Sequence, residues 1–402
     1  MTRTGAKYDA IIIGAGAAGL MAAGRAAARG AHVLVIDHNS EPGKKILISG
    51  GGRCNFTNVQ AGFGVHPPRY LSANPHFAKS ALGRFEPQDF IAMVDSAGIA
   101  WHEKTLGQLF CDGSARQIVA LLMEQCAGVA FRFGAPVDEV RHDGADFAVR
   151  VAGETLFASR LVLACGGPSI PKLGASDFAY RSARQFDLKI IEPRPALVPL
   201  TLGGDDLLFR ELSGVSTEVV ATAGEGKAKG VFREAALLTH RGLSGPAILQ
   251  ISSYWRKGEA ISLDFLPDDA AAAWLLASKA AQPNGSLAKL LADKLPQRLA
   301  QALAEKLGAA DKPLHALTDK ALDQMGQRLN RWRFTPNGSE GYAKAEVTIG
   351  GIATDGLNQK TLEAKHLPGL HVIGEAVDVT GWLGGYNFQW AWASGAAVGD
   401  VI

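Results

Sequence analysis

The chain has few cysteines for its length of 402 residues. The four are Cys54, Cys111, Cys126 and Cys165, and no two of them have the C-x-x-C spacing. Without that spacing, neither a zinc site nor a thioredoxin-like redox pair is expected, and we predict no metal site. A low cysteine content is also typical of the reducing cytoplasm and not of a disulfide framework.

Long apolar runs and a strong net charge are also absent. No stretch approaches the roughly 18 apolar residues of a membrane-spanning helix, and the apolar run at residues 10–13 is too short for a signal peptide. The formal net charge of +2 provides no general attraction to nucleic acid or to an anionic membrane. We therefore expect a cytoplasmic protein without a membrane partner, large enough for more than one domain.

The first motif with chemical meaning lies in the first twenty residues of the sequence. The β-branched run at residues 10–13 predicts a buried parallel strand, and Gly14-Ala15-Gly16-Ala17-Ala18-Gly19 follows it directly. In this G-x-G-x-x-G pattern the glycines permit a tight turn, approach of the backbone to a pyrophosphate, and close packing of the next helix. The alanine-rich segment 17–28 predicts that helix, whose N-terminus would present N–H groups to phosphate.

An acidic residue after the second predicted strand supports a dinucleotide site. The strand spans residues 32–36, and Asp37 lies 23 positions after Gly14, near the spacing expected for an acid that binds ribose hydroxyls. The carboxylate would repel a 2′-phosphate, which favours FAD or NAD over NADP at this site.

A second glycine-rich stretch, residues 43–58, contains three consecutive glycines between Ser49 and Arg53. Ordering such a run costs roughly 1 kcal/mol per glycine relative to alanine. One interpretation is backbone laid against a flat ring or a phosphate, with Lys45 and Arg53 supplying positive charge; the other is a long surface loop. Because an NAD site needs no such element, whereas FAD has a flavin half that must be held, this stretch favours FAD.

The last glycine-rich motif follows a predicted strand at residues 370–373. Gly374 and Glu375 come directly after that strand, and Gly384-Gly385 precedes a predicted helix at residues 387–401. The glycine pair would let backbone approach the flavin, and the helix N-terminus would stabilise negative charge on the flavin N1/C2 side during reduction. The two ends of the chain are therefore expected to fold together around one cofactor.

The region between these motifs predicts strands first and helices later. Short strands at 137–141, 147–151 and 155–159 indicate a β-meander, and a buried strand at 161–164 ends at Cys165-Gly166-Gly167. Pro193 and Pro195 mark a break, after which short apolar runs between glycines continue to residue 266. Helices are then predicted at 268–281, at 287–307 with a break at Pro296, and at 320–329.

Several of these motifs resemble the YhiN/BaiN-like family of bacterial FAD-binding flavoproteins, some members of which carry the label "aminoacetone oxidase family". The resemblance extends along most of the chain and rests on the segments 50–58, 161–169, 239–246, 346–351 and 384–389. It implies an α/β fold, a glutathione-reductase-like FAD-binding Rossmann domain with an inserted β-rich domain and an inserted helical domain. The family usually has Glu where this chain has Asp37, and either acid can bind ribose.

From the resemblance we expect the FAD-binding domain to comprise residues 1–190 and 346–402. The β-rich insertion would span residues 191–266 and return at 331–345, and the helical insertion would span 267–330. FAD is expected to be tightly bound, with the Val137 backbone near the adenine edge and Asp378 on the ribityl chain. The residues expected to contact FAD are Gly14, Gly16, Ala17, Ala18, Gly19, Asp37, His38, Lys45, Ser49, Gly50, Gly51, Arg53, Cys54, Asn55, Val137, Ala164, Cys165, Gly166, Gly167, Gly374, Glu375, Asp378, Gly384, Gly385, Tyr386 and Asn387.

The remaining sequence contains neither a second G-x-G-x-x-G unit nor a C-x-x-C pair. Reduction of the flavin would thus require either NAD(P)H that docks transiently or a substrate that is itself the donor. The candidate catalytic residues are Cys54, His240, Arg241 and Tyr386. Histidine is a common acid–base catalyst, which makes His240 a candidate, although a structural histidine is an equal interpretation. Packing alone would also explain Cys54.

Together these features predict an enzyme, a FAD-dependent oxidoreductase that transfers hydride through flavin N5 to or from a small or medium organic substrate. One alternative is an RNA-modifying flavoenzyme that reduces a uridine in structured RNA. It would bind RNA through Arg328, Arg331, Trp332, Arg333 and Phe334, a patch that a helix end with extended arginines would also explain. A further alternative is a flavin-bound sensor without turnover.

Overall fold

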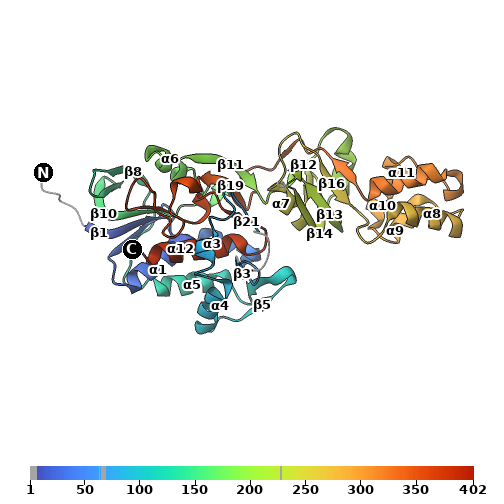
Figure 1. Cartoon of the computed structure of the whole chain (residues 1–402). Helices are drawn as coiled ribbons and strands as arrows, with labels where there is room; N and C mark the ends of the chain where they lie inside the picture. The colour runs from blue at the N-terminus through green and yellow to red at the C-terminus, as the bar shows by residue number, and fades with distance from the viewer. Residues whose placement is uncertain (1–6, 63, 65–68, 227–228) are drawn as a thin grey trace. The chain divides into compact units, whose positions relative to one another are not determined.

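The computed structural model describes residues 7–62, 64, 69–226 and 229–402. It divides the chain into two compact units, residues 1–194 with 347–402, and residues 195–346. The first and last segments of the chain, blue and red in Figure 1, lie in the same unit. The expected α/β fold with a Rossmann-type domain is confirmed. The finer division into five segments remains a proposal.

A mostly parallel sheet forms the centre of the first unit. Its parallel part has the order β7-β2-β1-β10, with β20 beside β10. The bounds are Ala130–Arg132 for β7, Val33–Ile36 for β2, Lys7–Ile13 for β1, Glu154–Leu163 for β10 and Leu370–Val372 for β20. Strands β9 (Phe147–Val151) and β8 (Val137–His142) extend it in antiparallel fashion. All of β2 is buried, as expected for a strand covered on both faces.

The prediction of two separate strands at 155–159 and 161–164 is wrong. Both belong to the single strand β10, because no turn residue separates them and Arg160 simply continues the pleat. The first half of β10 pairs with β9, and the second half pairs with β20, while β1 runs beside both halves. This strand therefore joins the meander to the Rossmann sheet.

Helix α1 (Ala17–Ala28) packs on strands β1 and β2 of this sheet and on two further helices. It lies against α12 (Tyr386–Gly399) on one side and α5 (Ala115–Gln125) on the other (Figure 1). Small residues make the first contact possible, since a Cβ on Gly395 or Gly399 would lie 2.5 or 2.7 Å from a carbonyl oxygen of α1. The last helix of the chain thus packs directly on the first.

Shorter elements complete the first unit. They are α2 (Lys44–Ile48), β3 (Asn55–Asn58), β4 (Tyr70–Leu71), α3 (Lys79–Leu82), α4 (Pro87–Ser96), β5 (Trp101–Glu103), β6 (Gln108–Cys111), α6 (Phe178–Gln185), β11 (Ile190–Ala196), β19 (Val347–Ile352) and β21 (Thr380–Gly381). Strands β3, β6 and β5 form a small sheet, β4 pairs with β21, and β11 pairs with β19. The pairings of β4 with β21 and of β11 with β19 connect earlier parts of the chain to its C-terminal segment.

The second unit contains an antiparallel sheet of order β17-β16-β13-β14-β15-β12-β18. The bounds are Trp332–Phe334, Ile261–Asp264, Ser216–Ala223, Gly230–Thr239, Gly242–Ser244, Leu200–Thr201 and Gly338–Ser339, in that order. Helix α7 (Pro246–Ser252) packs against β13 and β14. Buried aromatic rings, among them Phe209, Trp332 and Phe334, fill the core.

Between β16 and β17 of this sheet the chain forms helices α8 (Ala271–Ala281), α9 (Leu287–Ala292), α10 (Gln297–Lys306) and α11 (Asp319–Leu329). The predicted break at Pro296 is confirmed, since this residue is the N-cap of α10. The helix predicted from residue 268 begins only at Ala271. Among the residues that the structure describes, no helix is both long and apolar enough to cross a membrane.

Candidate cofactor and active site

The turn after β1 has a geometry that only glycine permits. Gly14 has φ +115°, and a Cβ on it would lie 2.6 Å from the carbonyl oxygen of Ala164, which follows β10. A Cβ on Gly19 would overlap the carbonyl oxygen of Gly14. These two glycines therefore let α1 pack against the ends of β1 and β10.

The N-terminus of α1 is open toward an anion. Gly16 is the N-cap and supplies no side-chain hydrogen bond, and the first turn holds no acidic residue. A Cβ on Gly16 would meet no protein atom within 4 Å. Backbone N–H groups and the positive end of the helix dipole suit a pyrophosphate, so this end of the helix fits the ADP half of FAD.

Asp37 lies beside this turn, directly after β2. Its Oδ2 accepts a hydrogen bond from the Ala15 N–H at 2.7 Å, and its Oδ1 accepts one from the Asn39 N–H at 2.8 Å. These bonds fix the carboxylate at the edge of the glycine turn. The position suits a ribose contact, which we keep as a proposal for Asp37 and the adjacent His38.

Residues 43–58 do not form the surface loop that was one of the two interpretations. They form helix α2, a 3₁₀ turn over Ser49–Gly52, and strand β3. A Cβ on Gly50 would lie 2.8 Å from the Phe110 ring, so the missing side chain makes room here for protein. Gly51 has no atom within 4 Å of such a Cβ, which leaves its backbone open to a cofactor.

Glu375 is the centre of a polar cluster that the sequence does not reveal. Lys45 Nζ lies 2.6 Å from its Oε2 and 2.5 Å from Ser169 Oγ. The other oxygen, Oε1, accepts hydrogen bonds from Ser169 Oγ at 2.7 Å and from the Thr348 N–H at 3.0 Å. The cluster joins α2, the segment after β10, strand β19 and the segment after β20. The positive charge that we expected Lys45 to supply to a cofactor is therefore paired with Glu375 within the chain.

An unsatisfied hydroxyl lies at this cluster. Thr348 Oγ1 is buried and has no hydrogen-bond partner among the described residues. A Cβ on Gly167 would lie 2.8 Å from this oxygen. Because leaving a buried polar group unpaired costs about 1–3 kcal/mol, the hydroxyl indicates a site that a bound group completes. Ser169 and Thr348 are therefore candidates that sequence reasoning missed.

The C-terminal motif forms the tight turn before α12. A Cβ on Gly384 would lie 2.9 Å from the Gln108 side chain, and one on Gly385 would overlap the Thr57 carbonyl. Asn58 Nδ2 donates to the Gly384 carbonyl at 2.9 Å. The second and third glycine-rich stretches are thus in direct contact, as the expected meeting of the two chain ends requires.

Asn387 and Asp378 bind the backbone of the chain itself. Asn387 exchanges two hydrogen bonds with Gly381, at 2.8 and 2.9 Å. The buried Asp378 accepts a hydrogen bond from the Ala73 N–H at 2.7 Å, and burial raises the pKa of its carboxyl group. Both side chains hold loops in place, and their expected contacts with FAD stay proposals.

Tyr386, the first residue of α12, is paired with an arginine that sequence reasoning missed. The Arg69 guanidinium donates to the Tyr386 hydroxyl and lies 5.4 Å from the ring centroid of Trp382. Burial raises the pKa of Tyr386, although the hydrogen bond from Arg69 opposes this shift. At neutral pH the pair is therefore a neutral phenol beside a cation, an arrangement that can donate a proton.

Cys54 is poorly suited to the catalytic role considered for it. The residue is fully buried, and burial raises the pKa of its thiol to about 12. The reactive form of cysteine is the thiolate, which is scarce at neutral pH when the pKa is this high. Burial also raises the pKa of Cys165 to about 12. Both thiols fit a packing role.

His240 and Arg241 lie in the second unit, in the exposed turn between β14 and β15. Arg210 Nε donates to the His240 carbonyl at 2.7 Å, and the Arg241 guanidinium lies 3.7 Å from Glu340. Cys54 and Tyr386 belong to the first unit, so the four catalytic candidates are divided between the two units. In the described ranges, no group of three or more His, Cys, Asp or Glu side chains could hold a metal ion.

The other residues expected to contact FAD lie at ends of the same elements. Ala17 and Ala18 are in the first turn of α1, Val137 begins β8, and Gly166 follows β10. Ser49 Oγ donates to the Ile46 carbonyl at 2.7 Å. Further residues of this set are Arg53 and Asn55 around the start of β3, and Gly374 after β20. Their roles remain proposals.

The prediction that the aromatic residues of the patch at 328–334 could contact RNA is wrong. Trp332 and Phe334 point inward on β17, are 2% and 0% exposed, and pack edge-to-face on Phe209. Alternation along the strand places Arg333 on the opposite face, where it is exposed, and Arg331 before the strand is exposed as well. Only the arginines of this patch can contact a partner.

The sheet order and the glycine turn after β1 define a Rossmann-type dinucleotide-binding domain. The family model described as "HI0933-like protein Rossmann domain" matches residues 8–401. The chain belongs to this HI0933-like family, and the resemblance to YhiN/BaiN-like proteins is confirmed. It is a FAD-dependent oxidoreductase with FAD as its cofactor.

Two curated relatives align with almost the whole chain. The chain is 50% identical over 400 residues, 98% of each chain, to the ribosomal RNA dihydrouridine synthase of Escherichia coli K12. It is 44% identical over 393 residues, 96% of each chain, to the protein of the same name from Haemophilus influenzae.

More distant likenesses include a reductase and a dehydrogenase of steroid-like compounds. The 3-dehydro-bile acid delta(4,6)-reductase of Clostridium scindens is 30% identical over 407 residues, 96% of this chain and 97% of the relative. The solved 3-ketosteroid-delta4-(5alpha)-dehydrogenase of Rhodococcus jostii RHA1 matches with a TM-score of 0.52 at 15% identity, covering 100% of this chain and 97% of that structure. The latter likeness shows the fold alone.

Proposed function

We propose that this FAD-dependent oxidoreductase reduces a uridine of ribosomal RNA to dihydrouridine. The observation that carries the proposal is the 50% identity, over 98% of both chains, with a ribosomal RNA dihydrouridine synthase. An alignment of this extent includes residues 195–346, the inserted unit that we expect to select the substrate.

A small organic substrate, our main expectation from the sequence, becomes the second candidate. The 30% identity with a bile acid reductase favours it, because that relative is named for the reduction of ring double bonds. Uracil also contains a C=C bond conjugated with a carbonyl group, so the two candidates share one type of reaction. A flavin-bound sensor without turnover is not retained, because the chain is an enzyme.

Reduction of uracil adds a hydride to C6 and a proton to C5 of the C5=C6 bond. FAD supplies the hydride chemistry when it is bound. The chain must therefore hold the cofactor, orient the base and deliver the proton. The uracil that is reduced cannot also supply the hydride, so we propose NAD(P)H as the electron donor. Because the sequence has no second nucleotide-binding motif, NAD(P)H would dock transiently.

The residues that would hold FAD are grouped by the part of the cofactor. The N-terminus of α1 would bind the pyrophosphate, with Asp37 at the adenosine ribose. The Glu375 cluster, with Lys45, Ser169 and the unpaired Thr348 hydroxyl, would hold the flavin half.

Tyr386 is our candidate for the proton donor at C5. Its hydroxyl accepts a hydrogen bond from Arg69 and therefore keeps its own proton available for donation. Burial keeps the pKa of the phenol high, so the group is protonated at neutral pH. The Arg69 cation would stabilise the phenolate that remains after the transfer.

The test is a reaction of the purified holoenzyme with NADPH and ribosomal RNA from a strain that lacks the enzyme. We expect dihydrouridine at a defined uridine, measured by mass spectrometry of nuclease fragments, and slow turnover of free uridine. Fast reduction of a small conjugated ketone with no dihydrouridine in the RNA would favour the second candidate instead.

A further inference from the structure

The second unit presents one face of its sheet to solvent. Along β14, β13, β16 and β17, side chains alternate between the two faces. The inner face carries Phe232, Leu263 and Trp332, all buried, and helix α7 packs over β13 and β14. We call the opposite face, with its outward side chains on these four strands, the outer face.

One row of residues crosses the outer face strand by strand. Arg333 on β17 is opposite Ser262 on β16, Ser262 is opposite Thr222 on β13, and Thr222 is opposite Val231 on β14. Arg333 and Val231 are exposed, Val231 by 51%, and the two hydroxyl residues are half-buried. The row therefore offers a guanidinium, two hydroxyl groups and a small apolar contact.

Arginines and acids both lie at this face, and the arginines differ in whether they are paired. In the part of the chain that the structure describes, neither Arg331 nor Arg333 forms an ion pair, whereas the nearby Arg233 is paired with Glu218 at 2.7 Å and Asp268 at 2.8 Å. Asp264 on β16 accepts hydrogen bonds from the Leu266 N–H and from Asn330, neutral groups that leave its negative charge in place. An approaching anion would therefore meet two guanidinium groups that form no ion pair among the described residues, beside one carboxylate.

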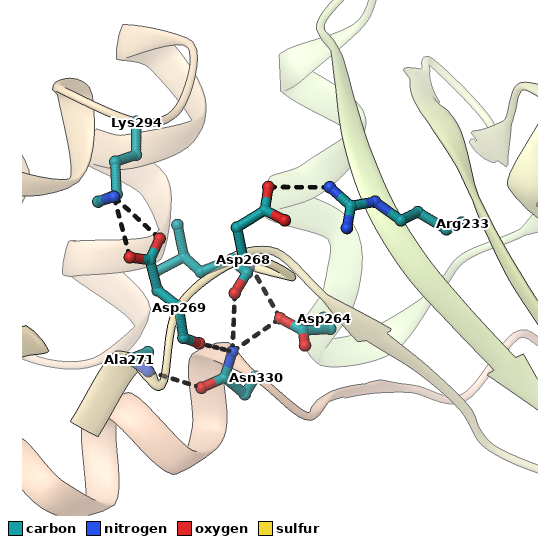
Figure 2. A network of polar contacts seen from close by, with 8 residues as sticks. Arg233, Asp264, Asp268, Asp269, Ala271, Lys294 and Asn330 are labelled. Atoms are coloured by element: carbon teal, nitrogen blue, oxygen red, sulfur yellow. Dashed lines mark hydrogen bonds and ion pairs between the residues drawn. The ribbon is translucent and has the colours of Figure 1, made fainter. Parts of the chain in front are cut away.

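A hydrogen-bond network fixes the chain just before these arginines, as Figure 2 shows. Asn330 Nδ2 donates to Asp264 Oδ1 at 2.8 Å and to the carbonyls of Leu266 and Asp269 at 3.1 and 3.0 Å. Its Oδ1 accepts a hydrogen bond from the Ala271 N–H at 2.8 Å. The backbone that carries Arg331 and Arg333 is thus held in place, so binding need not order it.

We propose that the outer face, together with the exposed Arg331 just before β17, binds the sugar–phosphate backbone of the RNA substrate through Arg331 and Arg333. The inference rests on the proposed function. Guanidinium groups form bidentate hydrogen bonds with phosphate oxygens. Hydroxyl groups such as those of Ser262 and Thr222 form hydrogen bonds with phosphate or ribose oxygens. No aromatic side chain lies in this row, which favours backbone contacts over base stacking. The face would therefore bind RNA by charge and shape.

The experiment compares two double variants of the holoenzyme. The first variant, Arg331→Ala with Arg333→Ala, removes the proposed phosphate-binding arginines. The control, Arg256→Ala with Lys257→Ala, removes the same charge from the exposed connection after α7. The probe is a labelled, uridine-rich single-stranded RNA, titrated over a range of salt concentrations. The Arg331→Ala, Arg333→Ala variant should bind the RNA roughly tenfold more weakly than the wild type at low salt. The slope of log K against log salt should fall by about 1.4, or about 0.7 for each lost phosphate contact.

Equal losses of RNA affinity in both variants, or an unchanged salt slope in the Arg331→Ala, Arg333→Ala variant, would overturn the proposal. The proposal would also be overturned if the Arg331→Ala, Arg333→Ala variant kept its RNA affinity and lost activity only on intact ribosomal particles. That result would indicate that the face binds a protein. The proposed function is tested separately. If the wild-type enzyme binds RNA with the expected salt slope but forms no dihydrouridine, the proposed function is wrong and the proposal for the RNA-binding face stands.

Discussion

At the scale of single residues, two glycines of one motif differ in what surrounds them. The position of a Cβ on Gly16 is empty to 4 Å, while a Cβ on Gly19 would overlap the Gly14 carbonyl. We therefore expect Gly16→Leu to fold normally and to be colourless, because the new side chain would occupy the pyrophosphate position. Absorbance of the flavin and the midpoint of thermal unfolding of the apoprotein measure both effects.

Gly19→Val is the contrasting variant. Because its side chain would meet backbone and not a ligand, it should lower the stability of the apoprotein itself, by about 2 kcal/mol or more. Full FAD binding by Gly16→Leu would contradict the assignment of this turn to the pyrophosphate.

Tyr386 is the residue on which the proposed proton transfer depends. Tyr386→Phe should retain FAD and lower the rate of dihydrouridine formation by about 10²-fold or more. Since burial raises the pKa of this phenol, its proton is present at neutral pH and is lost as the pH rises through that pKa. The wild-type rate should thus fall at high pH, and Tyr386→Phe should lack this fall.

Tyr70→Phe provides the matched control for this prediction. Tyr70 packs edge-to-face on Tyr386 at 6.0 Å, and its hydroxyl donates to the Ala61 carbonyl at 2.9 Å. Its loss should cost about 1 kcal/mol of stability and leave the pH profile unchanged. An unaltered profile in Tyr386→Phe would assign the proton to another group.

The packing role of Gly19 could be predicted from sequence because the atom for which it makes room, the Gly14 carbonyl oxygen, belongs to the same motif. The partner of Tyr386 could not, since Arg69 lies 317 positions away and no local pattern marks it. The same holds for Glu375, whose partner Lys45 is 330 positions distant. Such pairs form only when the fold brings the ends of the chain together.

At the scale of elements, Asn330 connects β16, the start of α8 and the end of α11. Asn330→Ala would leave the Ala271 N–H and two carbonyls without this partner, which we expect to cost about 2–4 kcal/mol. Gln327→Ala, which removes only an exposed contact with Asp323, should cost under about 0.5 kcal/mol. Urea unfolding followed by tryptophan fluorescence compares them, and equal midpoints would contradict the role of Asn330.

Elements with strong local signals were predicted well. The alanine-rich α1 has the expected bounds, and Pro296 divides α9 from α10. By contrast, the absence of a turn residue in 155–164 is only a weak signal for the continuity of β10, which the pairing with β1 and β20 shows. The basic and aromatic patch failed for a related reason: three strand residues cannot show which face the sheet will bury.

At the scale of the whole molecule, the two ends of the chain form one FAD-binding unit and residues 195–346 form a second. The sequence predicts the first because cofactor binding imposes recognisable spacings on glycines and acids. It does not predict the substrate, since an RNA backbone can be bound by scattered arginines and hydroxyl groups that have no fixed spacing. The outer face of the second unit is of this kind.

The most direct measurement is the dihydrouridine content of ribosomal RNA from cells that lack this enzyme. The account predicts loss of dihydrouridine at one or more defined uridines, with restoration by the wild-type gene and no restoration by Gly16→Leu. The RNA would be analysed by mass spectrometry, which detects the added pair of hydrogen atoms. Dihydrouridine that persists unchanged at every position in the deleted strain would contradict the proposed function.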